Sequence, residues 1–185
     1  MSIQGWVENV GWAGTDGASL TNSTAQTSLL PGSAKFTLPA NFFDKVGKSL
    51  RITATGRIST VTATPGTLLF ELKLGAVVAA SGGALSLNVS AQTNDTFVLE
   101  WLLTARAIGS GTSANLIHVG KITSRALLAG VANTAVSECM PDTAPAVGTG
   151  FDSTSSQVVD LMGTWSVASA SNSITLHQFI LEVLN

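Results

Sequence analysis

The chain has 185 residues, which fits one domain, and its formal net charge is −2. Charged residues make up 11% of the chain, well below the roughly 25% of typical soluble proteins. The nine Lys and Arg residues are scattered, which argues against nucleic acid as a partner. No apolar run approaches the roughly 18 residues that span a bilayer, so no membrane partner is predicted either.

The first 27 residues are rich in Gly, Ser, Thr and Asn and show no sustained hydrophobic period. They contain Trp6 and Trp12, and leaving a large aromatic ring in water costs roughly 1.5–3 kcal/mol. The segment 1–27 is therefore predicted as an extended arm ahead of a main domain, 28–185, although a disordered terminus is the alternative. The two tryptophans are predicted to attach this arm to a capsid or a neighbouring subunit.

Strand signals then recur along the chain. Residues 34–43 indicate a short strand ended by Pro39, and turns are predicted at 64–66 and 81–83. Residues 48–60 and 67–75 alternate apolar and polar side chains, which is typical of half-buried strands. The side chains predicted to face inward are Leu50, Ile52, Ala54, Gly56, Ile58, Leu68, Phe70, Leu72 and Leu74.

Further strands are predicted at 95–109, 114–130, 156–167 and 173–183, with a long Pro- and Gly-rich loop at 138–156. No segment shows a helical period with caps. About eight strands separated by turns indicate an all-β sandwich or barrel. The long loop suits a Greek-key crossing between sheets, so the predicted fold is an antiparallel two-sheet β-sandwich of the jelly-roll type.

Residues with catalytic or ligating chemistry form no recognisable site. His118 and His177 lie in predicted strands without a metal-binding spacing, and Cys139 is the only cysteine. Glu71 and Glu100 are the most plausible pair of catalytic carboxylates, but strand glutamates of this kind are usually solvated. No enzyme activity, metal or cofactor is predicted.

Two strands carry apolar side chains on both faces. On the last strand, Ile174, Leu176 and Ile180 would share one face, and a lone domain should not need the other face to be apolar. The first three residues are predicted to fill the core, although the period allows the two faces to be exchanged. The remaining apolar side chains are predicted to form an oligomer interface: Val98, Leu102, Phe179, Leu181 and Val183.

The runs of strands and turns at 36–60, 64–78, 81–84, 106–117, 143–154 and 165–185 together resemble a β-sandwich family of structural proteins in tailed phages. The resemblance covers residues 35–185 and assigns no active site. It implies a virion protein that forms a homotrimer and binds the major capsid protein or another virion protein, as a capsid decoration (cement) protein does. The alternative that it implies is a receptor- or carbohydrate-binding module of a fibre or spike.

Overall fold

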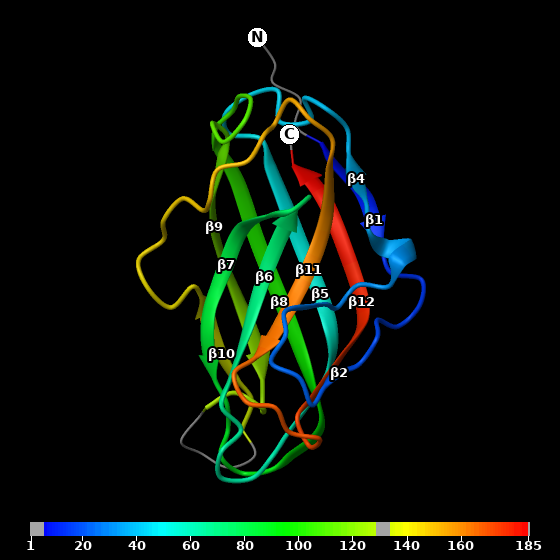
Figure 1. Cartoon of the computed structure of the whole chain (residues 1–185), viewed down its shortest axis with the longest axis vertical. Helices are drawn as coiled ribbons and strands as arrows, with labels where there is room; N and C mark the ends of the chain where they lie inside the picture. Colours follow the sequence, from blue (N-terminus) through cyan, green and yellow to red (C-terminus); the bar gives the residue numbers. More distant parts are fainter. Residues whose placement is uncertain (1–5, 129–133, 185) are drawn as a thin grey trace.

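The computed structural model describes residues 6–128 and 134–184. These residues form two antiparallel sheets that pack face to face, and they contain no α-helix (Figure 1). The chain is therefore an all-β sandwich of the jelly-roll type, which confirms the predicted fold class.

The seven-stranded sheet has the strand order β1-β12-β5-β8-β9-β10, and the short strand β2 also pairs with β12. Its strands are β1 (Val7–Trp12), β2 (Leu20–Thr21), β5 (Ser49–Thr60), β8 (Gln92–Ala107), β9 (Asn115–Ser124), β10 (Val136–Met140) and β12 (Ser173–Leu184).

The five-stranded sheet has the order β3-β11-β6-β7, and β4 also pairs with β11. Its strands are β3 (Thr27–Ser28), β4 (Thr37–Leu38), β6 (Thr67–Leu74), β7 (Val77–Ser86) and β11 (Gln157–Trp165), and a 3₁₀ helix, η1 (Gly32–Ala34), lies between β3 and β4. The connection from β10 to β11 passes from one sheet to the other, as the long loop predicted.

The core lies between the sheets and is built from the alternating residues of the long strands. All the inward positions predicted for 48–60 and 67–75 are buried. Two large rings lie over glycines on neighbouring strands: Phe97 over Gly56 and Trp101 over Gly120. A Cβ atom at these glycines would lie only 2.6 Å and 2.8 Å from the two rings, and closer still to backbone carbonyls of neighbouring strands. A larger residue would therefore displace both the ring and the adjacent strand.

The two faces of strand β12 differ from the prediction. Its pairing with β5 shifts between Leu176 and Gln178, which leaves His177 as an extra residue. Such a bulge changes which side chains face inward. Phe179, Leu181 and Val183 are therefore buried in the core of the single chain, and their assignment to an oligomer interface is wrong.

The same shift moves Ile180, which was predicted in the core, to the outside, where 39% of it is exposed. Ile174 and Leu176, before the bulge, are buried as predicted. One β-bulge thus lets both predicted apolar faces of the last strand supply the core.

The predicted turn at 81–83 is also wrong, because these residues lie inside β7. Gly83 has a φ of +77°, a value that glycine adopts readily, and the register with β6 shifts on either side of the pairing of Glu71 with Ser81. The Ser-Gly-Gly sequence therefore accommodates an irregular edge strand rather than a chain reversal.

The segment predicted as an arm contributes strands to the sandwich. Strand β1 pairs with β12 at the edge of the larger sheet, and the amides of Ala13 and Gly17 donate to carbonyls of β12. Strands β2 and β3 then pair with β12 and β11. Residues 1–5 of the predicted arm lie outside the described residues.

The corrected phase of β12 leads to the first prediction. Leu181→Ala should lower the free energy of unfolding by about 2–5 kcal/mol, because it opens a cavity in the core. Ile180→Ala, at the adjacent but exposed position, should cost far less. Chemical denaturation of both variants checks this, and equal losses would show that the bulge is placed wrongly.

Candidate functional site

The outer face of the seven-stranded sheet carries an apolar patch made of five side chains from four strands: Trp12, Val98, Leu102, Val119 and Ile180. Trp12 lies directly opposite Ile180, and Leu102 directly opposite Val119. Residues directly opposite in an antiparallel pair project on the same side. Two apolar pairs therefore lie on this face, one on β1 and β12 and one on β8 and β9. Strand β5 lies between them and places the polar residues Arg51 and Thr53 on the same face.

The five side chains of this apolar patch are far more exposed than core residues of the same types. Trp12 is 63% exposed, and the other four lie between 38% and 46%. Single apolar side chains scattered over a surface are normal, whereas several on one face of a sheet indicate an interaction surface. The patch is therefore the strongest candidate for a binding surface in the described part of the chain.

Charged side chains are interleaved with the apolar ones as two ion pairs. Arg51 Nε lies 2.7 Å from Glu182 Oε2, and Lys121 Nζ lies 3.0 Å from Glu100 Oε2. The hydrogen bond to Glu182 raises the pKa of Arg51 further above its usual value. An open groove of about 680 Å³ lies among these pairs, Leu102 and Val119. The groove is thus lined by apolar side chains together with two positive and two negative charges.

The sequence located three of the five patch residues. Val98 and Leu102 were predicted at an interface and Trp12 at an attachment point, and the structure brings all three to one face. Trp6, just before β1, is 61% exposed. Whether these four residues bind a partner stays a prediction. Val119 was missed, although its alternation with the buried Leu116 and Ile122 was a usable signal.

The other candidate residues are dispersed. Glu71 lies in β6 and Glu100 in β8, so the two belong to different sheets, point outward and cannot act as one carboxylate pair. His177 is on β12, and its Nδ1 atom lies 2.8 Å from Asp16 Oδ1. His118 is buried on the inner side of β9, and strands β5 and β8 separate β9 from β12. Across residues 6–128 and 134–184, no three His, Cys, Asp or Glu side chains gather closely enough to hold a metal.

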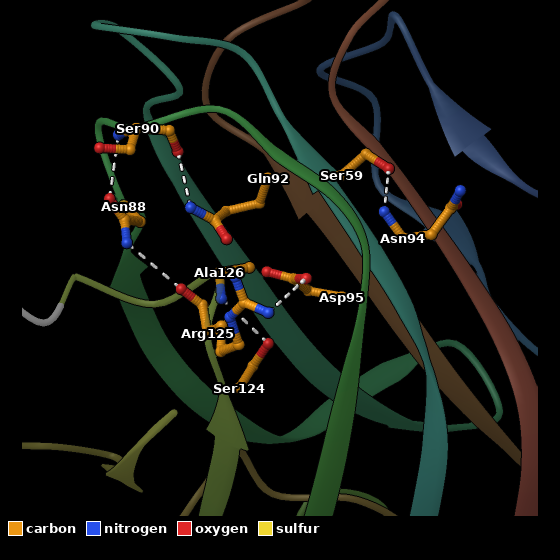
Figure 2. Close-up of polar contacts among 9 residues, drawn as sticks. All are labelled: Ser59, Asn88, Ser90, Gln92, Asn94, Asp95, Ser124, Arg125 and Ala126. Carbon is orange, nitrogen blue, oxygen red and sulfur yellow. Dashed lines mark hydrogen bonds and ion pairs between the residues drawn. The ribbon is translucent and has the colours of Figure 1, made fainter. Parts of the chain in front are cut away.

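One end of the sandwich holds a cluster of polar contacts (Figure 2). The Asn88 side chain donates to the Arg125 carbonyl at 3.3 Å and accepts from the Ser90 amide at 2.9 Å. The Gln92 side chain donates to the Ser90 carbonyl at 3.0 Å, and Arg125 lies 3.8 Å from Asp95. Because these bonds join the connection before β8 to the end of β9, the cluster has a structural role.

The described part of the chain has no helix that is long and apolar enough to cross a membrane. No protein-family model and no curated protein sequence matches the chain.

Several solved structures share parts of the β-sandwich arrangement. The CBM2 module of the evolved Dit of Lactobacillus casei BL23 phage J-1 is 11% identical, with a TM-score of 0.35, over 99% of this chain and 98% of that one. Lectin I of Ulex europaeus, in complex with the methyl glycoside of α-L-fucose, is 10% identical, with a TM-score of 0.43, over 97% and 98%. The winged bean acidic lectin, complexed with methyl-α-D-galactose, is 10% identical, with a TM-score of 0.32, over 98% and 100%.

Burial of His118 predicts a dependence of stability on pH. Burial lowers the pKa of its imidazole below the ordinary value of about 6.5. As the pH falls through 6.5, the unfolded chain takes up a proton that the folded chain does not bind until a lower pH. The free energy of unfolding should therefore fall from about pH 7 downward, and His118→Gln should remove this component.

Denaturant midpoints at about pH 7.5 and 5.5 check the effect, with His177→Gln as the control. Burial and Asp142 raise the pKa of Glu138, which adds stability on acidification and so has the opposite sign. Differences between variant and wild type cancel that contribution. An unchanged pH dependence in His118→Gln would contradict the prediction.

Proposed function

We propose that this protein is a non-enzymatic structural protein of a tailed-phage virion, where it forms a homo-oligomer through the outer face of its seven-stranded sheet. The observation that carries the proposal is the apolar patch of Trp12, Val98, Leu102, Val119 and Ile180. Apolar side chains on the open face of a sheet are best covered by another protein surface, because burial of apolar area drives most protein association.

The composition of the face supports a second copy of this chain as the occupant. The two ion pairs at the groove balance, so this part of the face presents no net charge to a second copy. The size is also suitable. Six strands spaced about 4.8 Å apart and about ten residues long cover about 800 Å². A stable interface buries about that area on each partner.

Attachment to the particle would then use surface outside this interface. Trp6 lies at the start of the edge strand β1 and is exposed, so it can contact the major capsid protein or another virion protein while the sheet face is occupied. This arrangement gives the protein the role of a capsid decoration (cement) protein, which links copies to one another and to the particle.

The oligomer is tested by Leu102→Asp, which places a charge in the centre of the patch. We expect a folded monomer, because Leu102 points away from the core, and an unpaired charge in an interface is strongly disfavoured. The matched control is Val158→Asp, a similarly exposed position on the other sheet, which should remain oligomeric. Analytical ultracentrifugation up to millimolar protein measures the mass, and a monomeric wild type would refute the proposal.

Cys139 offers an independent readout of the same interface. This exposed thiol lies opposite Lys121 on the outer face and borders the groove. In the oligomer it should react slowly with a thiol reagent, whereas in the Leu102→Asp monomer it should react at the rate of an open thiol. Equal rates in the two proteins would contradict an interface on this face.

A second candidate function is recognition of a glycan by the exposed tryptophans. Trp12 is exposed and lies directly opposite Ile180. A flat aromatic ring of this kind can stack on an apolar sugar face. A glycan panel monitored by tryptophan fluorescence tests this. Trp12→Ala should abolish a glycan response and Trp6→Ala should preserve it. Glycan binding by monomeric wild-type protein would favour this function over assembly.

A further inference from the structure

The strand register of the seven-stranded sheet arranges its outward side chains in rows that cross the strands. One row follows β1, β12, β5, β8 and β9 in turn, because each of its residues lies directly opposite the next: Trp12, Ile180, Thr53, Glu100 and Lys121. Residues directly opposite in an antiparallel pair project on the same side. This row is therefore apolar on β1 and β12 and charged on β8 and β9.

The adjacent row has its apolar and charged groups in the opposite order. On the same five strands it contains Asn9, Glu182, Arg51, Leu102 and Val119. This row is polar on β1, β12 and β5, and apolar on β8 and β9. The two apolar pairs, Trp12 with Ile180 and Leu102 with Val119, therefore lie at the two ends of one diagonal across the face, which we call the apolar diagonal. The two ion pairs lie on either side of it.

Groups of both kinds are accessible to a second copy. The four apolar residues on the diagonal are 39–63% exposed, and the four charged side chains are 22–56% exposed. Arg51 donates through Nε to Glu182, and the other N–H groups of its guanidinium can donate to a further carboxylate. The arrangement of these groups therefore restricts the orientations in which two copies can pack.

We propose, on the basis of the outer-face oligomer proposed above, that two copies form a dimer whose twofold axis lies in the interface along the apolar diagonal. Such an axis turns the second copy over, so residues on the axis face their own counterparts. Ile180 then packs on Ile180 of the partner subunit, and Leu102 on Leu102 of the partner subunit. Arg51 and Glu100 lie on opposite sides of the axis, so each faces the other in the second copy. This arrangement is a dimer, whereas the phage resemblance implies a trimer.

Other twofold axes in the same plane give poorer matches. An axis along the strands lays Ile180 over Glu100 of the partner subunit, and an axis across the strands lays Ile180 over Glu182 of the partner subunit. Both place a charge against an apolar side chain, which is disfavoured. An axis at right angles to the apolar diagonal lays the two different apolar pairs on each other, but it also brings the two Arg51 side chains together. Like charges in an interface are penalised, so the axis along the apolar diagonal is favoured.

Single cysteines locate the axis, each introduced together with Cys139→Ser so that the native thiol is absent. On mild oxidation, Ile180→Cys and Leu102→Cys should each form a disulfide-linked dimer alone, because each residue faces its own counterpart. The matched control is Val158→Cys, which is as exposed as Ile180 but lies on the other sheet and should stay unlinked. Non-reducing gel electrophoresis measures the linked fraction.

The outcomes separate this axis from the oligomer itself. If the wild type is oligomeric by ultracentrifugation but either variant fails to link alone, the proposed axis is wrong and the outer-face oligomer still stands. Linkage only in a mixture of the two variants would indicate the axis at right angles to the diagonal. A trimeric mass would also overturn the axis, and a monomeric wild type would overturn both proposals.

Charge reversal tests the contact between Arg51 and Glu100 of the two copies. Glu100→Lys should raise the dissociation constant of the dimer at least about tenfold, because a lysine then faces Arg51 at two symmetric places. Glu182→Lys is the matched control, since it makes the same change and also removes one ion pair within the chain. It should have the smaller effect, because Glu182 lies over Thr53 of the partner subunit. The reverse order, measured by sedimentation velocity, would contradict the proposed axis.

Discussion

The structure depends on the extra residue in β12, His177, because it sets which side chains of the C-terminal half of that strand face the core. Strand β12 pairs with β5 on one side and with β1 and β2 on the other. The side toward which each β12 residue points therefore also sets the orientation of the paired residues on these neighbouring strands. With the bulge, Phe179, Leu181 and Val183 fill the sandwich and Ile180 turns outward next to Trp12. Without it, three core side chains would face solvent, at a cost of roughly 1.5–3 kcal/mol each. The apolar patch on the outer face is thus a consequence of how the core is filled.

The sequence predicted those strands in which apolar and polar residues alternate regularly and only one face is buried. Strands β5, β6 and β8 alternate without interruption through most of their length, and every inward residue predicted for the first two is buried. The bulge in β12 could not be predicted, because one inserted residue changes the phase without changing the composition. Strand β1 was also missed as a strand. Its pairing with β12 joins residues more than 160 positions apart, and its own six residues are too few and too irregular to show a period.

The candidate site likewise has a part that the sequence could reveal and a part that it could not. Val98 and Leu102 were identified because β8 is apolar on both sides, which a local pattern reveals. The order of apolar and charged groups across the face depends on the register between strands that are distant in the sequence, and no single strand shows it. The outer face is therefore visible in part in a local pattern, whereas the order of its groups arises only from the pairing of distant segments.

Within the outer face, the apolar and charged groups have separate roles. The pairs Arg51–Glu182 and Glu100–Lys121 are partly exposed, and such pairs contribute little to affinity because water already solvates them. The apolar patch must therefore supply most of the binding free energy. The charges instead select orientation, because a docking geometry that places Arg51 against Lys121 of a second copy is penalised, whereas one that places it against Glu100 is favoured. A weakly charged chain can thus still define a specific arrangement of copies, since the four charges interleaved with the apolar side chains disfavour the wrong registers.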